Sequence, residues 1–241
     1  MNLITNLFQS SVGKKYIMAI TGGCLLLFVL GHLAGNLQIF LGREIINRYA
    51  HFLQSNPELI WPVRMGMLVI LALHIWAGIT LSLENKAARP VAYAQYQPFG
   101  STFASQTMLL SGLMVFAFLG YHLLHYTAKV QFINLTHQDF AAFTEKLPGP
   151  ASVERPDIFK MMVVGFRKPI VSAFYVLGLA LLGLHLSHGA SSLFHSLGWR
   201  TDAYRPCLDR AARVLALLLF LGYCAIPAAI LCGYGKEVLC P

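Results

Sequence analysis

Five long apolar segments alternate with polar segments along the chain. Each apolar segment has about 20 residues or more, the length that an α-helix needs to cross the hydrocarbon core of a bilayer. The alternation of apolar and polar residues that membrane β-strands require is absent. The pattern predicts an all-α integral membrane protein with one helical-bundle domain over residues 1–241. The five expected transmembrane helices cover residues 16–41, 61–83, 106–128, 169–194 and 214–233.

The segments between these helices differ in character. The first apolar run follows a short polar stretch with Lys14 and Lys15, but it exceeds the about 7 to 15 residues of a signal-peptide core, so we expect a retained helix. Residues 42–59 are amphipathic and are expected to lie at the membrane interface. Residues 129–168 form the longest polar connection and are expected to cap the bundle. Pro227 predicts a kink in the fifth helix.

Composition supports the membrane interpretation. The chain is 56% hydrophobic and 12% charged, whereas an average soluble domain has about 25% charged residues. The net charge of +8 comes from connections and helix ends, where Lys and Arg meet lipid headgroups, so nucleic-acid binding is not expected. The five cysteines form no CxxC or CxxCH motif, which excludes zinc-type spacing and thioether-attached haem.

Histidines inside the apolar segments are the candidate functional residues. Six of the nine histidines lie in four of the predicted helices: His32, His74, His122, His125, His185 and His188. Ionisable side chains at bilayer depth are rare, and they face a bundle interior, pair with one another or bind something. His51 lies in the amphipathic connection and is interpreted as an interfacial surface histidine.

The depths of these histidines suggest two pairs. With a rise of about 1.5 Å per residue, His32 and His122 lie at nearly the same depth in the outer half of the membrane. His74 lies in the inner half, level with His185 or His188, and depth alone slightly favours His185. Two imidazoles on facing helices at each level are what two bis-histidine haems require. Neutral imidazole is the ligating form, so the haem interpretation also avoids a buried charge.

Other uses of buried histidine stay open. A single intramembrane histidine also serves as a hydrogen-bonded packing residue or as part of a proton relay. Zinc or di-iron sites would need nearby carboxylates or thiols, and none of the predicted helices has an interior Asp or Glu. The same feature argues against a proton transporter. Gly31 and Gly35 flank His32 and are expected to let a flat ligand approach the backbone.

Four motifs resemble those of a known family: LGHLAGNLQIFLG, ALHIWAG, LGYHLLHYT and HLSHGASSLFHSLG. They are similar to the single-chain, five-helix, di-haem cytochrome b membrane anchor of succinate:quinone oxidoreductases and quinol:fumarate reductases. The resemblance covers essentially the whole chain. It implies a respiratory-chain subunit, linked to the tricarboxylic acid cycle, that binds no dicarboxylate itself. Two haem b groups would carry electrons between an iron–sulfur subunit, paired with a flavoprotein subunit, and menaquinone or ubiquinone.

The resemblance also implies roles for individual residues. His32 and His122 would ligate the haem distal from the catalytic subunits, and His74 and His188 the proximal haem. His188 is preferred because the family pattern places this ligand immediately before a glycine, here Gly189; His185 stays as the alternative. Some relatives couple proton movement through a glutamate two residues before this ligand, and this chain has Leu186 there.

A quinone headgroup needs hydrogen-bond partners and an apolar slot near one haem. We expect this site at the outer end of the bundle, formed by Gln38, His51 and Arg64, with Asn36 and Arg43 within reach. The inner end is the alternative, with Ser10, Ser11, Tyr93 and Tyr96.

Charge at the helix ends indicates orientation and partners. Lys14, Lys15 and the arginine-rich connection at 195–213 favour a cytoplasmic N-terminus in a bacterial inner membrane. The same face is expected to dock the iron–sulfur subunit through Lys86, Arg89, Arg200, Arg205 and Arg210. Two other functions stay open: the cytochrome b of a formate, hydrogenase or nitrate reductase complex, and a non-redox proton or ion transporter.

Overall fold

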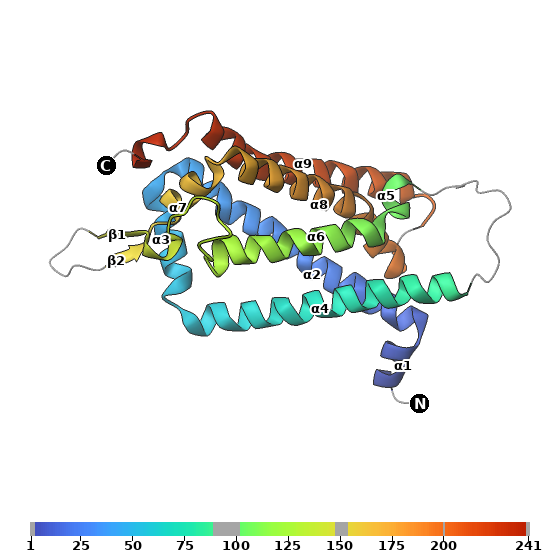
Figure 1. Cartoon of the computed structure of the whole chain (residues 1–241). Helices are drawn as coiled ribbons and strands as arrows, with labels where there is room; N and C mark the ends of the chain where they lie inside the picture. The colour runs from blue at the N-terminus through green and yellow to red at the C-terminus, as the bar shows by residue number, and fades with distance from the viewer. Residues whose placement is uncertain (1–2, 89–101, 148–153, 200, 240–241) are drawn as a thin grey trace. The chain divides into compact units, whose positions relative to one another are not determined.

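The computed structural model describes residues 3–88, 102–147, 154–199 and 201–239. Its long helices confirm the prediction of an all-α, multi-pass membrane protein (Figure 1). Five helical segments are long and apolar enough to cross a membrane: Ser11–Leu41, Pro57–Ala87, Met108–Thr127, Pro169–Ser196 and Arg205–Leu231.

These segments are built from named elements. The first joins α2 (Ser11–Leu37) to the 3-10 turn η1 (Gln38–Leu41), and the second is α4 (Pro57–Ala87). The third joins α6 (Met108–His122) to the π-helical turn η2 (Leu123–Thr127). The fourth is α8 (Pro169–Ser196) and the fifth is α9 (Arg205–Leu231), with Pro227 inside it.

Shorter elements lie between these segments. The helices are α1 (Leu3–Gln9), α3 (Arg43–Gln54), α5 (Phe103–Gln106), α7 (Ile158–Phe166), η3 (Phe140–Ala142) and η4 (Lys236–Leu239). Strands β1 (Thr144–Lys146) and β2 (Glu154–Pro156) pair antiparallel, with Glu145 opposite Arg155.

Helices α2, α4, α8 and α9 extend past their predicted ends. In α4 and α9, charged residues continue the helix beyond the hydrocarbon region. Helix α4 runs past Leu83 and so includes Glu84, which forms an ion pair with the buried Lys14 of α2. Helix α9 starts at Arg205, nine residues before the predicted Val214, and includes Asp209, which accepts a hydrogen bond from Ser191. These two carboxylates lie at helix ends, outside the predicted spans, whose interiors contain no Asp or Glu.

The chain divides into two compact units, each described by itself. The first contains residues 1–29, 64–113 and 182–218, and the second contains residues 30–63, 114–181 and 219–241. Each unit receives one stretch from each of the five spanning segments. Each unit therefore has its own set of facing helices.

The second unit has a core centred on α7. Phe159, Met162, Val163 and Phe166 are buried there with other residues of the same unit. With 9 residues, α7 is too short to cross a bilayer. The connection at 129–168 is thus not uniformly polar: it contains an apolar helix whose burial fixes the surrounding segments.

A buried polar network joins α3 to this connection. Asn47 is fully buried, and its amide donates to Glu145 (2.8 Å) and Asp157 (2.9 Å) while its carbonyl oxygen accepts from the backbone N–H of Phe159 (2.9 Å). Asp157 also caps α7 by accepting from the backbone N–H of Lys160 at 3.0 Å. Buried polar groups are stable only when they are paired in this way.

Two arginines provide the charge in the same network. Arg43 lies 2.5 Å from Asp157 and 2.9 Å from Glu145. Arg155, nearly buried, pairs with Glu145 at 2.6 Å and with Glu44. The hydrogen bond from Arg155 lowers the pKa of Glu44 below its ordinary value. Arg43 is therefore held by carboxylates of its own unit.

We expect Asp157→Ala to destabilise the second unit by about 2 to 3 kcal/mol, because the change removes a helix cap and leaves the buried Asn47 amide one acceptor short. Denaturant-induced unfolding of the detergent-solubilised protein measures this loss. Asp139→Ala is the matched control, since Asp139 caps only the short helix η3 by accepting from Ala141 at 2.9 Å. Equal losses for the two variants would contradict a special role for the network.

Candidate histidine sites in the transmembrane helices

The structure brings the intramembrane histidines together in two pairs, one in each unit. In the second unit, the ring centres of His32 and His122 lie 5.8 Å apart, at an interplanar angle of 81°. In the first unit, those of His74 and His185 lie 6.4 Å apart at 75°. Facing helices thus supply each pair: α2 and α6 in one unit, and α4 and α8 in the other.

The ring separations fit one metal ion between each pair. Metal–imidazole bonds are about 2 Å long and each ring nitrogen lies roughly 1.2 Å from its ring centre, so two rings on one ion have centres about 6 to 6.5 Å apart. The observed separation of 6.4 Å lies within this range, and that of 5.8 Å lies slightly below it. Each pair offers two imidazoles, the number that a bis-histidine haem takes from the protein.

Hydrogen bonds assign the tautomer of His74. Its Nδ1 lies 3.2 Å from the hydroxyl oxygen of Thr21 on α2. That hydroxyl donates its single proton to the backbone carbonyl of Ile17 (2.6 Å), so it can only accept from the histidine. His74 therefore carries its proton on Nδ1, and Nε2 presents the lone pair that a metal needs.

The same arrangement holds His185. Its Nδ1 lies 3.3 Å from the hydroxyl oxygen of Ser111 on α6, and Ser111 donates its proton to the backbone carbonyl of Met108 at 3.1 Å. The hydroxyl again accepts, so His185 also carries its proton on Nδ1 and presents Nε2. Hydrogen bonds of this kind to the second ring nitrogen orient metal-binding histidines.

A glycine follows each of these hydroxyl residues and makes room for the histidine ring. A Cβ atom at Gly22 would lie 3.0 Å from Cε1 of His74, and one at Gly112 would lie 3.2 Å from Cε1 of His185. Sequence reasoning missed Thr21, Gly22, Ser111 and Gly112. The feature that could have revealed them is a hydroxyl–glycine pair in a spanning helix, in ITGG and in LSGL.

His188 occupies a different environment from His185. Its Nε2 lies 2.9 Å from the hydroxyl oxygen of Ser192, one turn along the same helix. The ring of His185 pairs with that of His74. The motif resemblance favours His188 as the ligand on α8, whereas the side-chain geometry favours His185.

In the second unit, a tyrosine takes the place of the small hydroxyl residues. The Tyr175 hydroxyl lies 3.3 Å from Nδ1 of His122 and 3.0 Å from Nδ1 of His125. His125 is fully buried in the π turn η2, where the backbone N–H of Ala128 donates to the carbonyl of Leu123. Such π turns interrupt α-helices mostly at functional sites. Sequence reasoning did not identify Tyr175.

The glycines around His32 have different roles. No other heavy atom lies within 4 Å of where a Cβ atom at Gly31 would stand, so space beside this residue is open. A Cβ atom at Gly35 would lie 3.0 Å from the Tyr49 ring of α3. The small size of Gly35 therefore allows the Tyr49 ring to approach α2 closely.

The predicted quinone residues are distributed over both units. Gln38 begins η1 and the half-buried His51 lies in the last turn of α3, both in the second unit. Arg64 lies in α4, in the first unit. Asn36 donates to the backbone carbonyl of His32 at 2.9 Å. Tyr93, Tyr96, Arg89 and Arg200, named above for the inner face, lie outside the described residues.

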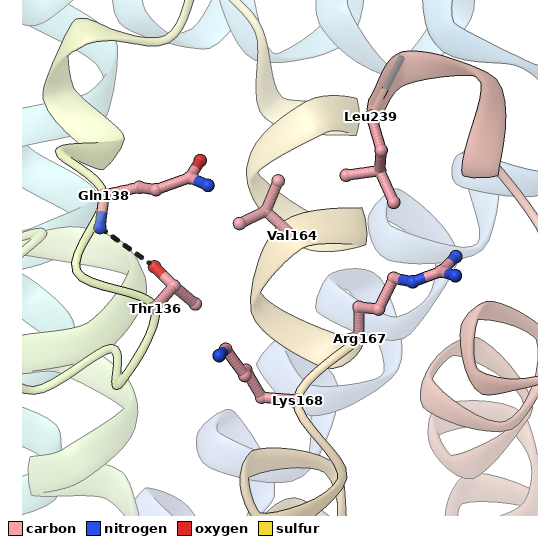
Figure 2. A pocket seen from close by; sticks show the side chains of 6 residues that line it. All are labelled: Thr136, Gln138, Val164, Arg167, Lys168 and Leu239. Atoms are coloured by element: carbon pink, nitrogen blue, oxygen red, sulfur yellow. Dashed lines mark hydrogen bonds between the residues drawn. The ribbon is translucent and has the colours of Figure 1, made fainter.

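A pocket of about 290 Å³ in the second unit is lined by other residues (Figure 2). Figure 2 shows the Lys168 side chain directed toward the loop that holds Thr136 and Gln138, and Arg167 directed toward Leu239. The loop is shaped by a hydrogen bond from the Gln138 backbone N–H to Thr136, at 3.3 Å. The lining of the pocket contains none of the predicted site residues.

Comparison of the chain with protein-family models, with curated proteins and with solved structures finds no match. The histidine geometry and the motif resemblance are thus the grounds for assigning a function.

We expect Thr21→Val to weaken ligand binding at the His74 and His185 pair by about 10- to 100-fold, because the change removes the hydrogen bond that orients His74. Haem retention during purification in detergent measures the effect. Thr21→Ser is the matched control, since it keeps the hydroxyl group and should retain wild-type binding. Equal retention in the valine and serine variants would show that the hydrogen bond does not matter.

Proposed function

We propose that this chain is the membrane-anchor cytochrome b subunit of a succinate dehydrogenase or fumarate reductase complex. In this role it transfers electrons between an iron–sulfur subunit and a membrane quinone through two b-type haems. The motif resemblance supports the family, and the multi-pass helical fold is the architecture that the family requires.

The observation that most strongly supports the proposal is the presence of one histidine pair in each unit. Both ring separations, 5.8 and 6.4 Å, suit an iron ion between two imidazoles. Haem, when bound, supplies one-electron redox chemistry. The chain's own residues place the two imidazoles of each pair face to edge and hold Nδ1 of His74 and His185 against the hydroxyls of Thr21 and Ser111.

The side-chain geometry favours a specific ligand set within this proposal. His32 and His122 would hold one haem, as the resemblance implies. For the other haem, His74 has His185 as its partner, because His185 faces it and has its Nδ1 anchored by Ser111. We therefore adopt His185 as the ligand and treat His188, which the resemblance favours, as the alternative.

Partners and location complete the proposal. The flavoprotein and iron–sulfur subunits would dock on the face with the N-terminus, where Lys86, Arg205 and Arg210 offer positive charge. We place this face on the cytoplasmic side of a bacterial inner membrane. A cytochrome b of a formate, hydrogenase or nitrate reductase complex would bind haem in a similar way, and its soluble partners would distinguish it.

The haem content tests the proposal directly. We expect about two haem b groups per chain by pyridine haemochrome assay, since each histidine pair supplies one bis-histidine site. His185→Ala should remove one haem, whereas His188→Ala should retain both. A wild-type value near zero would favour a non-redox transporter, and haem loss only in His188→Ala would restore the ligand that the resemblance implies. The soluble subunits that co-purify identify the type of complex.

A separate prediction concerns the quinone. Electrons arriving from the cytoplasmic side would need two haems only if the quinone reacts beside the second, so we expect the site at the outer end, near Gln38, His51 and Arg64. Substitutions Gln38→Ala, His51→Ala and Arg64→Ala should each lower quinone turnover about tenfold or more, as the loss of a hydrogen bond to a bound ligand typically does. Ser11→Ala serves as the inner-end control. Normal turnover in the three outer variants, with loss in Ser11→Ala or Tyr93→Phe, would place the site at the inner end.

A further inference from the structure

The Tyr175 hydroxyl joins two histidines of the second unit. It lies 3.3 Å from Nδ1 of His122 and 3.0 Å from Nδ1 of His125. The ring of Tyr175 is buried, and Phe166 and Phe118 contact it edge-to-face at centroid distances of 4.9 and 5.3 Å. These contacts keep the hydroxyl between the two imidazoles.

The hydroxyl has one proton, so it can donate to only one of the two histidines. If His122 binds iron through Nε2, its own proton lies on Nδ1, and Tyr175 must accept from it. The tyrosine then donates its proton to Nδ1 of His125. His125 consequently carries its proton on Nε2. Metal binding by His122 thus fixes the direction of every hydrogen bond in this chain of three residues.

His125, at the far end of this hydrogen-bonded chain, lies in an environment that is unusual for a residue that serves packing alone. Among the described residues, Nε2 of His125 is a buried atom without a hydrogen-bond partner. Leaving a buried polar atom without a partner is unfavourable. Packing alone would be better served by an apolar side chain, so the position of His125 is better explained by its hydrogen bond to Tyr175.

The hydroxyls beside the histidine pair of the first unit are arranged differently. There, Thr21 and Ser111 use their protons on carbonyls of their own helices and only accept from the ligand histidines. Tyr175 instead uses its proton on a second histidine, which polarises the hydroxyl and makes it a better acceptor for His122. A stronger acceptor at Nδ1 makes an imidazole a stronger electron donor to a metal.

We propose that Tyr175, oriented by His125, is a positioning residue that lowers the midpoint potential of the haem held by His32 and His122. The proposal rests on the proposed function, since it requires haem at that pair. The tyrosine does not touch the iron. It acts through His122, by stabilising the ferric form relative to the ferrous form.

Potentiometric titration of single-haem proteins tests the proposal. A His74→Ala background leaves only the haem of His32 and His122. In this background, Tyr175→Phe keeps the ring and removes the hydroxyl. We expect the ferrous-to-ferric ratio at a fixed applied potential to rise about tenfold, which is a rise of about 59 mV in midpoint potential for one electron.

The matched control uses the other haem. In a His32→Ala background, which leaves the haem of His74 and His185, Tyr175→Phe should leave the potential unchanged. His125→Leu in the first background should raise the potential by less than Tyr175→Phe. The double variant should match Tyr175→Phe alone, because His125 acts only through the hydroxyl.

Several results would overturn the proposal. An unchanged potential in Tyr175→Phe with haem retained would do so, as would an equal shift in the control background. If Tyr175→Phe loses its haem, His125→Leu decides: a raised potential supports the proposal, and an unchanged one overturns it. Failure of the proposed function is separate, because it appears as missing haem in the wild-type protein before any variant is made.

Discussion

The central physical constraint in this protein is that a nitrogen of a buried imidazole is unfavourable when it has neither a hydrogen-bond partner nor a bound ligand. Water is not available at bilayer depth to provide one. In the first unit the partners are the hydroxyls of Thr21 and Ser111, which have given their own protons to backbone carbonyls. The helix backbone therefore determines which ring nitrogen is left with a lone pair. Tautomer, ring orientation and ligand-binding capacity all follow from one type of contact.

The polar network at α3 also pairs buried polar groups with one another, here between α3 and the long connection. Asn47, Asp157 and Arg155 are buried. Asn47 of α3 bonds to Glu145, Asp157 and Phe159 of the long connection, whereas Asp157 and Arg155 each have partners in both segments. Because each group would be unfavourable alone, the segments they join are held as a set. This keeps α7 buried beside α8, the helix that presents Tyr175 to the histidines.

Much of the helical fold could be predicted from the sequence, because hydrophobic length reports directly on membrane spanning. The pairing of His32 with His122 followed from counting residues along helices of constant rise. The choice between His185 and His188 could not be made in this way, because the two lie within one turn of each other. The choice needed side-chain contacts. His185 contacts the Ser111 hydroxyl and its ring pairs with that of His74.

Other features were missed for identifiable reasons. A serine or threonine in an apolar helix usually bonds to its own backbone, so Thr21 and Ser111 looked ordinary in the sequence. Helix α7 was missed because a short apolar stretch between polar flanks does not resemble a spanning helix. Glu84 was placed outside its helix because the predicted boundary followed hydropathy and not hydrogen bonding.

The π turn η2 has a consequence for how such a protein could diverge. A π turn holds one more residue than an α turn, and it lies after His122 and contains His125. Deleting one residue between Leu123 and His125 would restore an α-helix and rotate the position of His125 by about 100° around the helix axis. His122 would keep its place, while His125 would lose its contact with the Tyr175 hydroxyl. A single codon gained or lost there would thus change the hydrogen-bond partners around His122 without changing His122 itself.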